Sequence, residues 1–262
     1  MLFTHSLSVR YSETGIAGTL KPASIFNWFQ DIASDHCAKL GVSALDLLKL
    51  GLAWVVYKYE IELFRYPVWK EDICIITWRS PFKNIYEMRA FEVMDEDRNV
   101  IARAKSAWVL IDLEKKRPLR LNRHLPASLF DNQGPKVEND LFELALPDSP
   151  NHECRFFVRM HDLDFNNHVN NAVYVQWAIE SVLPEIAMKC RPNRIRIHFA
   201  NESLFEDEIL SKSECTAENN GFSCRHTLIN TTSGRETARA ETHWLPFDQI
   251  CTKTNRPYHK QY

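Results

Sequence analysis

Two stretches of the chain show the spacing of an amphipathic helix. Between Pro22 and Gly41, apolar side chains recur at i, i+3, i+4 and i+7. A second stripe occupies residues 173–181 and stops before Pro184. Each stretch predicts one long helix that buries a broad apolar face. The two stripes comprise Ile25, Trp28, Phe29, Ile32, Ala33 and Cys37, and then Val173, Tyr174, Trp177, Ala178 and Ser181.

The same order of elements occurs twice along the chain. In each half a short strand precedes the helix, and alternating stretches such as YEIELF and IRIHF then predict strands joined by turns such as DEDRN and NTTSG. Trp28 recurs as Trp177 at an offset of 149 residues, and the later strands align at an offset of 136. That second offset superposes Arg89 on Arg225, Ala102–Ala104 on Ala238–Ala240, and Trp108 on Trp244. The shared offset indicates a duplication.

The repeat predicts an α+β fold with two similar domains. A strongly curved antiparallel sheet wrapped around one apolar helix buries both the inner sheet face and the helix stripe. We expect an N-terminal domain over residues 1–125, a linker over 126–152 and a C-terminal domain over 153–262. The linker is polar between its prolines and is not expected to form a domain.

Composition disfavours several functional classes. The chain has 262 residues and a net charge of −2, so no global field attracts nucleic acid or an anionic membrane, and a charged partner must meet a local patch. Only 7 glycines are present, and neither GxGxxG nor GxxxxGK occurs. Glycine-dependent phosphate loops are therefore disfavoured.

The seven cysteines are scattered, odd in number and without a CxxC pair. They predict neither a disulfide framework nor a zinc site, and we interpret them as mostly buried free thiols in a reducing compartment. No metal site is predicted. The N-terminal segment lacks a basic stretch followed by an apolar run, and no uncharged apolar run reaches about 18 residues. These features predict a cytoplasmic protein, neither secreted nor membrane-spanning.

The two halves differ most just before the second helix. Residues 162–171, DLDFNNHVNN, hold a polar cluster in which Asp164, Asn166 and His168 alternate. The first half carries at the same places Gly15, Ala17 and Thr19. In an extended link, alternation would point the three polar side chains the same way, toward the helix start. The alternative, that Asx residues favour helix entrances, explains one or two asparagines but not the whole run.

The entrance of the second helix also supplies hydrogen-bond donors. Asn170 or Asn171 is expected to cap this helix. The first backbone N–H groups of a helix have no partner within it, so they form a natural site for a carbonyl oxygen that becomes negative. An oxyanion site beside the polar cluster is therefore predicted.

The string DLDFNNHVNNAVYVQWAIES resembles the D-x-N-x-H-V-N-N segment, followed by Tyr, Trp and Glu, of plant and bacterial acyl-acyl carrier protein thioesterases. The segment QDIASDH and the ITW strand near Trp78 are also similar to that family. The resemblance implies tandem hotdog domains, the architecture that the repeat indicates independently. It also implies hydrolysis of fatty acyl-acyl carrier protein to free fatty acid and carrier protein.

In that family the motif acts with a Glu on a following strand, 34 residues beyond the His, where this chain has Glu202. The resemblance implies an active site of Asp164, Asn166, His168 and Glu202. Glu202 is expected on a strand that pairs with the other half near Tyr66.

The family's Cys after that Glu is Ser203 in this chain. A serine hydroxyl is a weaker nucleophile that needs a well-placed base, so we interpret the reaction as direct attack by water with Glu202 as general base. This reaction needs no cofactor. Minor roles are assigned to Ser203, Asn170 and Asn171.

The resemblance also implies that the N-terminal half binds the acyl chain. The side chains assigned to this pocket are Phe26, Trp28, Phe29 and Trp54. The alternative is that these aromatic residues belong only to the core.

The expected partner is an acyl carrier protein that carries a phosphopantetheine-linked acyl chain. Because carrier proteins are acidic, docking requires a local basic cluster. Two clusters qualify, and the second leads into the strand before Glu202; a solvated run of charge is the alternative for each. They are Lys115, Lys116, Arg117, Arg120 and Arg123, and then Arg191, Arg194 and Arg196.

Three other functions fit parts of the pattern. An acyl-coenzyme A thioesterase shares the chemistry and differs in the carrier. A hotdog dehydratase also uses a His and a carboxylate but lacks this motif. A non-catalytic acyl-thioester sensor normally carries a DNA-binding segment, which is not visible here, and neither nucleic acid nor membrane is an expected partner. The number of chains in the assembly stays open, with a homodimer as one option.

Overall fold

The computed structural model describes residues 2–16, 18–131, 133–137 and 142–250. The N-terminal half contains β1 (Phe3–Ser8), α1 (Pro22–Lys39), α2 (Ala44–Leu48), β2 (Leu52–Leu63), β3 (Asp72–Phe82), β4 (Tyr86–Met94), β5 (Val100–Asp112), β6 (Arg117–Pro118), α3 (Leu121–His124) and α4 (Ser128–Asp131). The C-terminal half contains β7 (His152–Phe157), α5 (Asn171–Glu180), α6 (Pro184–Lys189), β8 (Cys190–Phe199), β9 (Glu208–Glu218), β10 (Gly221–Asn230), β11 (Arg235–Pro246) and α7 (Phe247–Ile250). The two predicted long helices are α1 and α5, and α4 falls within the predicted linker.

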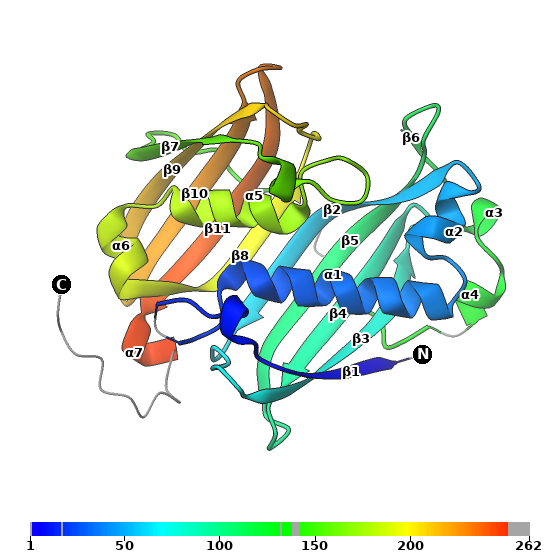
Figure 1. The fold of residues 1–262 in the computed structure, drawn as a ribbon, viewed down its shortest axis with the longest axis horizontal. Helices are drawn as coiled ribbons and strands as arrows, with labels where there is room; N and C mark the ends of the chain where they lie inside the picture. The colour runs from blue at the N-terminus through cyan, green and yellow to red at the C-terminus, as the bar shows by residue number, and fades with distance from the viewer. Residues whose placement is uncertain (1, 17, 132, 138–141, 251–262) are drawn as a thin grey trace.

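All strands belong to one antiparallel sheet, in the order β1-β3-β4-β5-β2-β8-β11-β10-β9-β7, with β6 paired to β5. Helices α1 and α5 lie side by side on one face of this sheet, as Figure 1 shows. The predicted α+β class, with a curved sheet around a helix in each half, is confirmed. The halves were expected to pair near Tyr66, whereas the two half-sheets join through β2 and β8 at other residues, because edge-to-edge register leaves no signal in local periodicity. No helix in the described ranges is long and apolar enough to span a bilayer.

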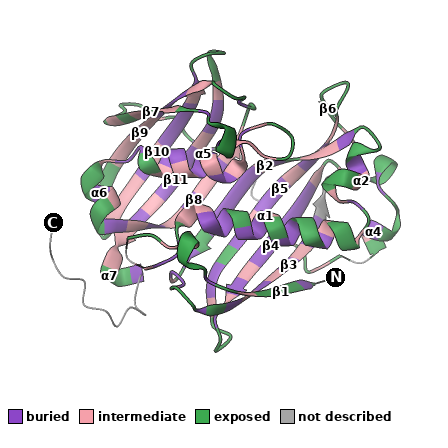
Figure 2. Cartoon of the chain, viewed as in Figure 1, coloured by how far each residue is buried: buried purple, intermediate pink, exposed green. Residues whose placement is uncertain are grey.

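The main core lies between the helices and the inner face of the sheet. Figure 2 shows the buried positions of α1, α5 and the strands facing one another across this layer. Phe29 and Ile25 of α1 are fully buried, and Trp177 of α5 is almost so. Burying side chains of this size stabilises the fold by about 1.5–3 kcal/mol each, so the apolar stripes hold both helices on the sheet.

Equivalent elements confirm the duplication. Strand β7 lies 149 residues after β1, and β9 lies 136 residues after β3, with identical lengths. Trp108 donates to Ser106 Oγ at 2.8 Å, and 136 residues later Trp244 donates to Thr242 Oγ1 at 2.7 Å. The two halves therefore share one frame, and differences between them identify later specialisation.

The predicted match of Arg89 with Arg225 is wrong by one residue. Arg89 lies opposite Arg79 and Ser106, whereas the equivalents of those two residues, Cys215 and Thr242, lie opposite Cys224. Arg89 therefore corresponds to Cys224. A one-residue slip places a side chain on the other face of a sheet, and Arg225 is accordingly on the outer face, paired with Asp148.

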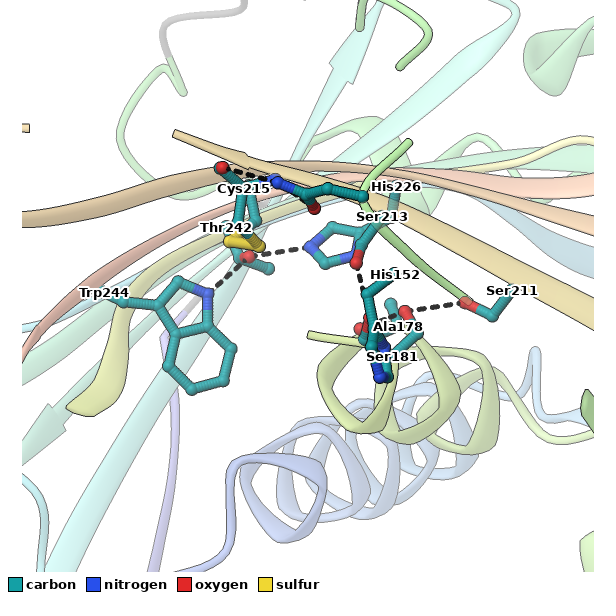
Figure 3. The surroundings of a disulfide bond; sticks show 11 residues. His152, Ala178, Ser181, Ser211, Ser213, Cys215, His226, Thr242 and Trp244 are labelled. Atoms are coloured by element: carbon teal, nitrogen blue, oxygen red, sulfur yellow. Dashed lines mark hydrogen bonds between the residues drawn. A yellow bond between two sulfur atoms is a disulfide. The ribbon is translucent and has the colours of Figure 1, made fainter. Parts of the chain in front are cut away.

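A disulfide joins Cys215 and Cys224 across β9 and β10, which the interpretation of the cysteines as mostly buried free thiols did not predict. Figure 3 shows the hydroxyl network beside it, in which His226 and Trp244 both contact Thr242. Of the free cysteines in the described residues, Cys190 is buried, and three others are only half-buried: Cys37, Cys74 and Cys154. Cys251 lies outside the described residues.

The N-terminal half has charged groups where the C-terminal half has this disulfide. Arg89 is buried and its guanidinium contacts His36 Nδ1 at 3.0 Å and Cys37 Sγ at 3.3 Å. Burial, together with Arg89 beside it, lowers the pKa of His36 to about 3. Arg79 next to it pairs with the buried Glu87. The two interiors therefore differ in chemistry although their backbones match.

The two half-sheets join where Lys58–Glu62 of β2 pairs with Arg194–His198 of β8. Glu60 Oε1 there accepts from Arg194 Nη2 at 2.5 Å and from Arg196 Nε at 2.8 Å, and its Oε2 lies 2.9 Å from Lys105 Nζ. Burial acts to raise the pKa of Glu60, but the three cationic donors together lower it to about 2. Glu60 is therefore ionised and neutralises the basic groups at the junction.

The linker crosses the face of the sheet opposite the helices. Carbonyl groups at 142, 144 and 146 accept hydrogen bonds from Lys58 of β2, Arg239 of β11 and Arg225 of β10. Residues 142–146 of the linker are thus bound by one strand of the N-terminal half and two strands of the C-terminal half, each through a cationic side chain.

His226 predicts a measurable pH dependence of stability. Complete burial lowers its pKa to about 3, so the folded state keeps it neutral while the unfolded state protonates below about pH 6.5. Stability is therefore lost as pH falls from about 6.5 toward 3, at about 1.4 kcal/mol per pH unit for this group. His226→Gln should reduce the slope of unfolding free energy against pH by that amount, measured by denaturant unfolding between pH 6 and 4. Replacing the exposed His161 by Gln is the control; equal slopes in all three proteins would contradict the assignment.

Candidate active site

The polar cluster before α5 forms a tight loop and not the extended link that alternation assumed. Leu163 and Val169 bridge its ends. The Asp164 carboxylate accepts from the N–H of Asn166 at 2.7 Å and from the N–H of His168 at 3.4 Å, and the Asp164 N–H donates to the His168 carbonyl at 2.7 Å. Asp164 therefore shapes its own loop through backbone hydrogen bonds.

The helix entrance is capped by Asn170, whose side chain accepts from the Ala172 N–H at 2.9 Å. The Val173 N–H is also bonded, to the Asn170 carbonyl. Asn171 is the first residue of the helix. In the part of the chain that the structure describes, the Asn171 N–H is thus the one donor of the first three left for an oxyanion, fewer than the sequence suggested.

Glu202 lies in a loop beyond the end of β8 and not on the strand, contrary to expectation. Backbone N–H groups at 200 and 201 donate to the Thr237 carbonyl of β11, which fixes the start of this loop. Tyr66 lies near the opposite end of β8, where its hydroxyl donates to the Pro192 carbonyl at 2.6 Å. The sheet places Glu202 at the end of the strand because β8 stops at Phe199.

His168 and Glu202 meet across these two loops. His168 Nε2 is 3.2 Å from Glu202 Oε2, and the side chains are 40% and 50% exposed. The Val169 N–H donates to the Ser203 carbonyl at 3.1 Å and joins the loops next to the pair. The result is a histidine–carboxylate pair that water reaches directly.

Ser203 is fully buried, although it follows the exposed Glu202. Tyr174 of α5 lies against it, and burial, opposed by hydrogen bonding to Ser203, raises the pKa of Tyr174 to about 12. Tyr174 therefore stays neutral and supports the segment that presents Glu202. The Ser203 hydroxyl lies beneath the open pair and not beside it.

Asn166 lies two residues before His168 and is exposed. In the described structure its side chain makes no contact with Glu202, and its N–H donates to Asp164. The site therefore brings together His168 and Glu202 directly, and Asp164 through the backbone. Among the described residues, no three His, Cys, Asp or Glu side chains gather as a metal ion would require.

Lys116 reaches this site from the N-terminal half. Its Nζ lies 3.4 Å from Glu202 Oε1, on the opposite carboxylate oxygen from His168. The sequence assigned Lys116 to carrier docking. Local pattern could not reveal the contact, because it depends on how β2 and β8 align the halves.

The two predicted docking clusters have different environments. All five residues of the first, between Lys115 and Arg123, are exposed. In the second, Arg194 and Arg196 are bound to Glu60, and Arg191 donates to two carbonyls at the end of β8 remote from Glu202. The first cluster is therefore the more exposed of the two, and its Lys116 contacts Glu202.

The predicted acyl-pocket aromatics lie in the interior of the N-terminal half. Phe29 stacks on Phe91 with ring centroids 4.4 Å apart, and Phe26 lies edge-on to Tyr59. The other two residues are Trp28, which donates to Glu13, and Trp54, which packs on a second apolar cluster. Contact with an acyl chain stays a prediction for all four.

Family models match both halves of the chain. The acyl-ACP thioesterase N-terminal domain matches residues 1–129, and the acyl-ACP thioesterase C-terminal domain matches residues 147–246. This chain belongs to the acyl-acyl carrier protein thioesterase family. The resemblance inferred from the motif is thereby confirmed.

Curated relatives include plant enzymes. The palmitoyl-acyl carrier protein thioesterase of Gossypium hirsutum, a chloroplastic protein, is 26% identical over 97% of this chain and 68% of its own length. The oleoyl-acyl carrier protein thioesterase 2 of Arabidopsis thaliana is 27% identical over 90% of this chain and 74% of its own. The chain spans 62 to 68% of the length of the Gossypium and Cuphea viscosissima relatives.

Solved structures share the whole architecture. A putative oleoyl thioesterase from Lactobacillus plantarum superposes with a TM-score of 0.85 at 19% identity, covering 94% of this chain and 96% of that one. The 12:0-ACP thioesterase from Umbellularia californica gives 0.81 at 24% identity, covering 94% of both chains. The tandem hotdog fold is thereby confirmed.

The loop geometry generates a test of Asp164. Asp164→Ala removes the acceptor for two backbone N–H groups and should lower the thioesterase rate about a hundredfold, because small displacements of reacting groups cost that much. Asp164→Asn keeps a carbonyl acceptor and should stay within about tenfold of the unmodified protein. Steady-state release of thiol measures both rates. If both variants lost the same amount of activity, the rate would depend on the negative charge of Asp164 and not on its hydrogen bonds to the loop.

Proposed function

We propose that this protein hydrolyses the thioester of a fatty acyl-acyl carrier protein by direct attack of water, with Glu202 as the general base. The observation that carries this proposal is the His168–Glu202 pair, 3.2 Å apart and open to solvent, on the motif of the family to which the chain belongs. Water is thus available at the carboxylate without a further opening step.

In this reaction a water molecule gives one proton to Glu202 while its oxygen bonds to the thioester carbon. His168 donates to Glu202 through Nε2 and orients the carboxylate. The carbonyl oxygen becomes an oxyanion, and the donors proposed to stabilise it are the Asn171 N–H and the Asn166 side chain. The carbon–sulfur bond then breaks, and the proton held by Glu202 passes to the leaving thiolate. Free fatty acid and carrier thiol are the products.

Burial of Ser203 supports water as the nucleophile. A serine nucleophile must contact both its base and the substrate carbon, whereas Ser203 is 0% exposed beneath Tyr174. Acylation of Ser203 would require the loop to open. Direct attack by water requires no such change.

The carrier is proposed to be an acyl carrier protein with a phosphopantetheine arm, as the names of the relatives suggest. The exposed basic cluster between Lys115 and Arg123 supports this choice, because an acidic carrier needs a local cationic surface on a protein of net charge −2. Acyl-coenzyme A presents the same thioester and is the comparison substrate. The relatives are named for different acyl chains, so the chain length is left to the assay. A cytoplasmic location and a homodimer remain predictions.

The general-base assignment has a direct test. Glu202→Gln and His168→Ala should each lower turnover at least about a hundredfold, while Ser203→Ala should stay within about tenfold. Glu206→Gln, an exposed carboxylate in the same loop, is the matched control and should keep the full rate. Release of thiol from acyl-carrier substrate measures activity, and thermal unfolding checks folding. A folded Glu202→Gln protein with more than about a third of the original rate would remove Glu202 from the mechanism.

Carrier docking is tested by charge reversal. Lys115→Glu with Arg120→Glu should raise the Michaelis constant for acyl-carrier protein, most strongly at low salt, and leave an acyl-pantetheine thioester almost unaffected. Arg98→Glu, in the exposed turn at the other end of β5, is the control. Equal losses on both substrates would indicate damage to the site. No loss on the carrier substrate would exclude docking through this cluster.

A further inference from the structure

Glu202 is held by donors from both halves of the chain. His168 of the C-terminal half contacts Oε2 at 3.2 Å, and Lys116 of the N-terminal half contacts Oε1 at 3.4 Å. In the described ranges these are the two ionic contacts of Glu202. Its side chain is 50% exposed, so protein packing alone does not restrict its rotation. The two donors therefore define the plane of the carboxylate.

The hairpin between β5 and β6 is built to present Lys116. The Asp112 carboxylate accepts from the N–H groups of Glu114 at 3.1 Å and Lys115 at 2.9 Å and tightens the turn. Lys116 itself has φ +47°, a left-handed backbone that costs a non-glycine residue free energy. β6 then pairs with the end of β5 and fixes the far side of the turn. The ammonium group thus projects from a shaped turn on a strand that is anchored in the sheet.

The other half provides an internal control for this contact. The residue equivalent to Glu202 is Tyr66, which is buried and whose N–H donates to the Ile250 carbonyl of α7. In both halves, therefore, the segment after the first long strand, β2 or β8, contacts the region that follows the last long strand of the other half. The contact is a buried backbone hydrogen bond at Tyr66 and an exposed ionic contact at Glu202.

We propose that Lys116 is a positioning residue for the hydrolytic reaction, so that the N-terminal half completes the active site of the C-terminal half. By holding Oε1, Lys116 keeps Oε2 and the adjoining lone pairs directed to His168 and to the attacking water. This inference rests on the proposed role of Glu202 as general base. It assigns the N-terminal half a part in the chemical step, beyond binding of the acyl chain.

The size of the effect follows from the exposure of the contact. An exposed ion pair contributes at most about 1 kcal/mol, so loss of Lys116 should lower kcat about three- to fivefold. The groups facing Glu202 are His168 from its loop, Lys116 from the hairpin, and neutral Tyr174 from α5, with Asp207 farther along the same segment. Because Lys116 acts on the orientation of the carboxylate, its loss should change kcat and leave KM almost unchanged.

The experiment compares Lys116→Ala, Lys116→Arg and Lys49→Ala, each alone and combined with Glu202→Gln, on an acyl-pantetheine thioester that lacks the carrier protein. Lys49 is an exposed lysine at the end of α2, beside the Gly51 carbonyl that accepts the Leu113 N–H of the same hairpin. Lys116→Ala should lower kcat three- to fivefold with little change in KM. Lys116→Arg should restore kcat, and Lys49→Ala should leave it unchanged.

In the Glu202→Gln background, Lys116→Ala should have no further effect, because its action passes through the carboxylate. An equal loss in both backgrounds, or a kcat of Lys116→Ala equal to that of Lys49→Ala, would overturn the positioning role while leaving Glu202 as base. Full activity of Glu202→Gln alone would instead refute the proposed function. The two failures are thus distinguishable.

Discussion

The antiparallel pairing of β2 with β8 is the interaction on which the rest of the structure depends. In an isolated half, β2 or β8 would be an edge strand with unpaired backbone groups. Pairing of β2 with β8 removes both of these edges. Glu60 stabilises the junction, because it neutralises Arg194, Arg196 and Lys105 where their charges would otherwise repel one another. The same pairing sets the two halves at one fixed angle. The N-terminal hairpin consequently reaches the catalytic loop of the C-terminal half.

The duplicated halves keep one backbone and differ in the side chains placed on it. The position of Arg89 in the first half is occupied by Cys224 in the second, where a disulfide and a hydroxyl network replace buried charges. The place of Glu202 is occupied by the buried Tyr66 in the first half. The interior of the C-terminal half, which carries the candidate site, is held by the disulfide and by hydroxyl hydrogen bonds. The interior of the N-terminal half is charged, and among the described residues Arg89 has no carboxylate partner there.

The candidate site combines an open histidine–carboxylate pair with a rigid support. His168 and Glu202 are exposed, yet the loops that carry them are held by Asp164, by the Val169–Ser203 backbone bond and by Tyr174 beneath. Rigid support matters because an exposed side chain otherwise samples several rotamers and loses its alignment. Ser203, which occupies the family's cysteine position in the same segment, is fully buried.

Periodicity in the sequence determined α1 and α5, the succession of helix and strands along each half and the duplication, because helix and strand periods are local properties of the chain. The motif and its spacing also identified His168 and Glu202, which the fold brings within contact distance. Three features depended on tertiary structure alone. The fused sheet and the Lys116–Glu202 contact join residues more than 80 positions apart. The Cys215–Cys224 disulfide depends on which residues of β9 and β10 lie opposite each other. Alternation predicts the face on which a side chain lies, whereas its neighbour across the sheet is set by strand register and bulges, and that is why the sequence left these contacts open.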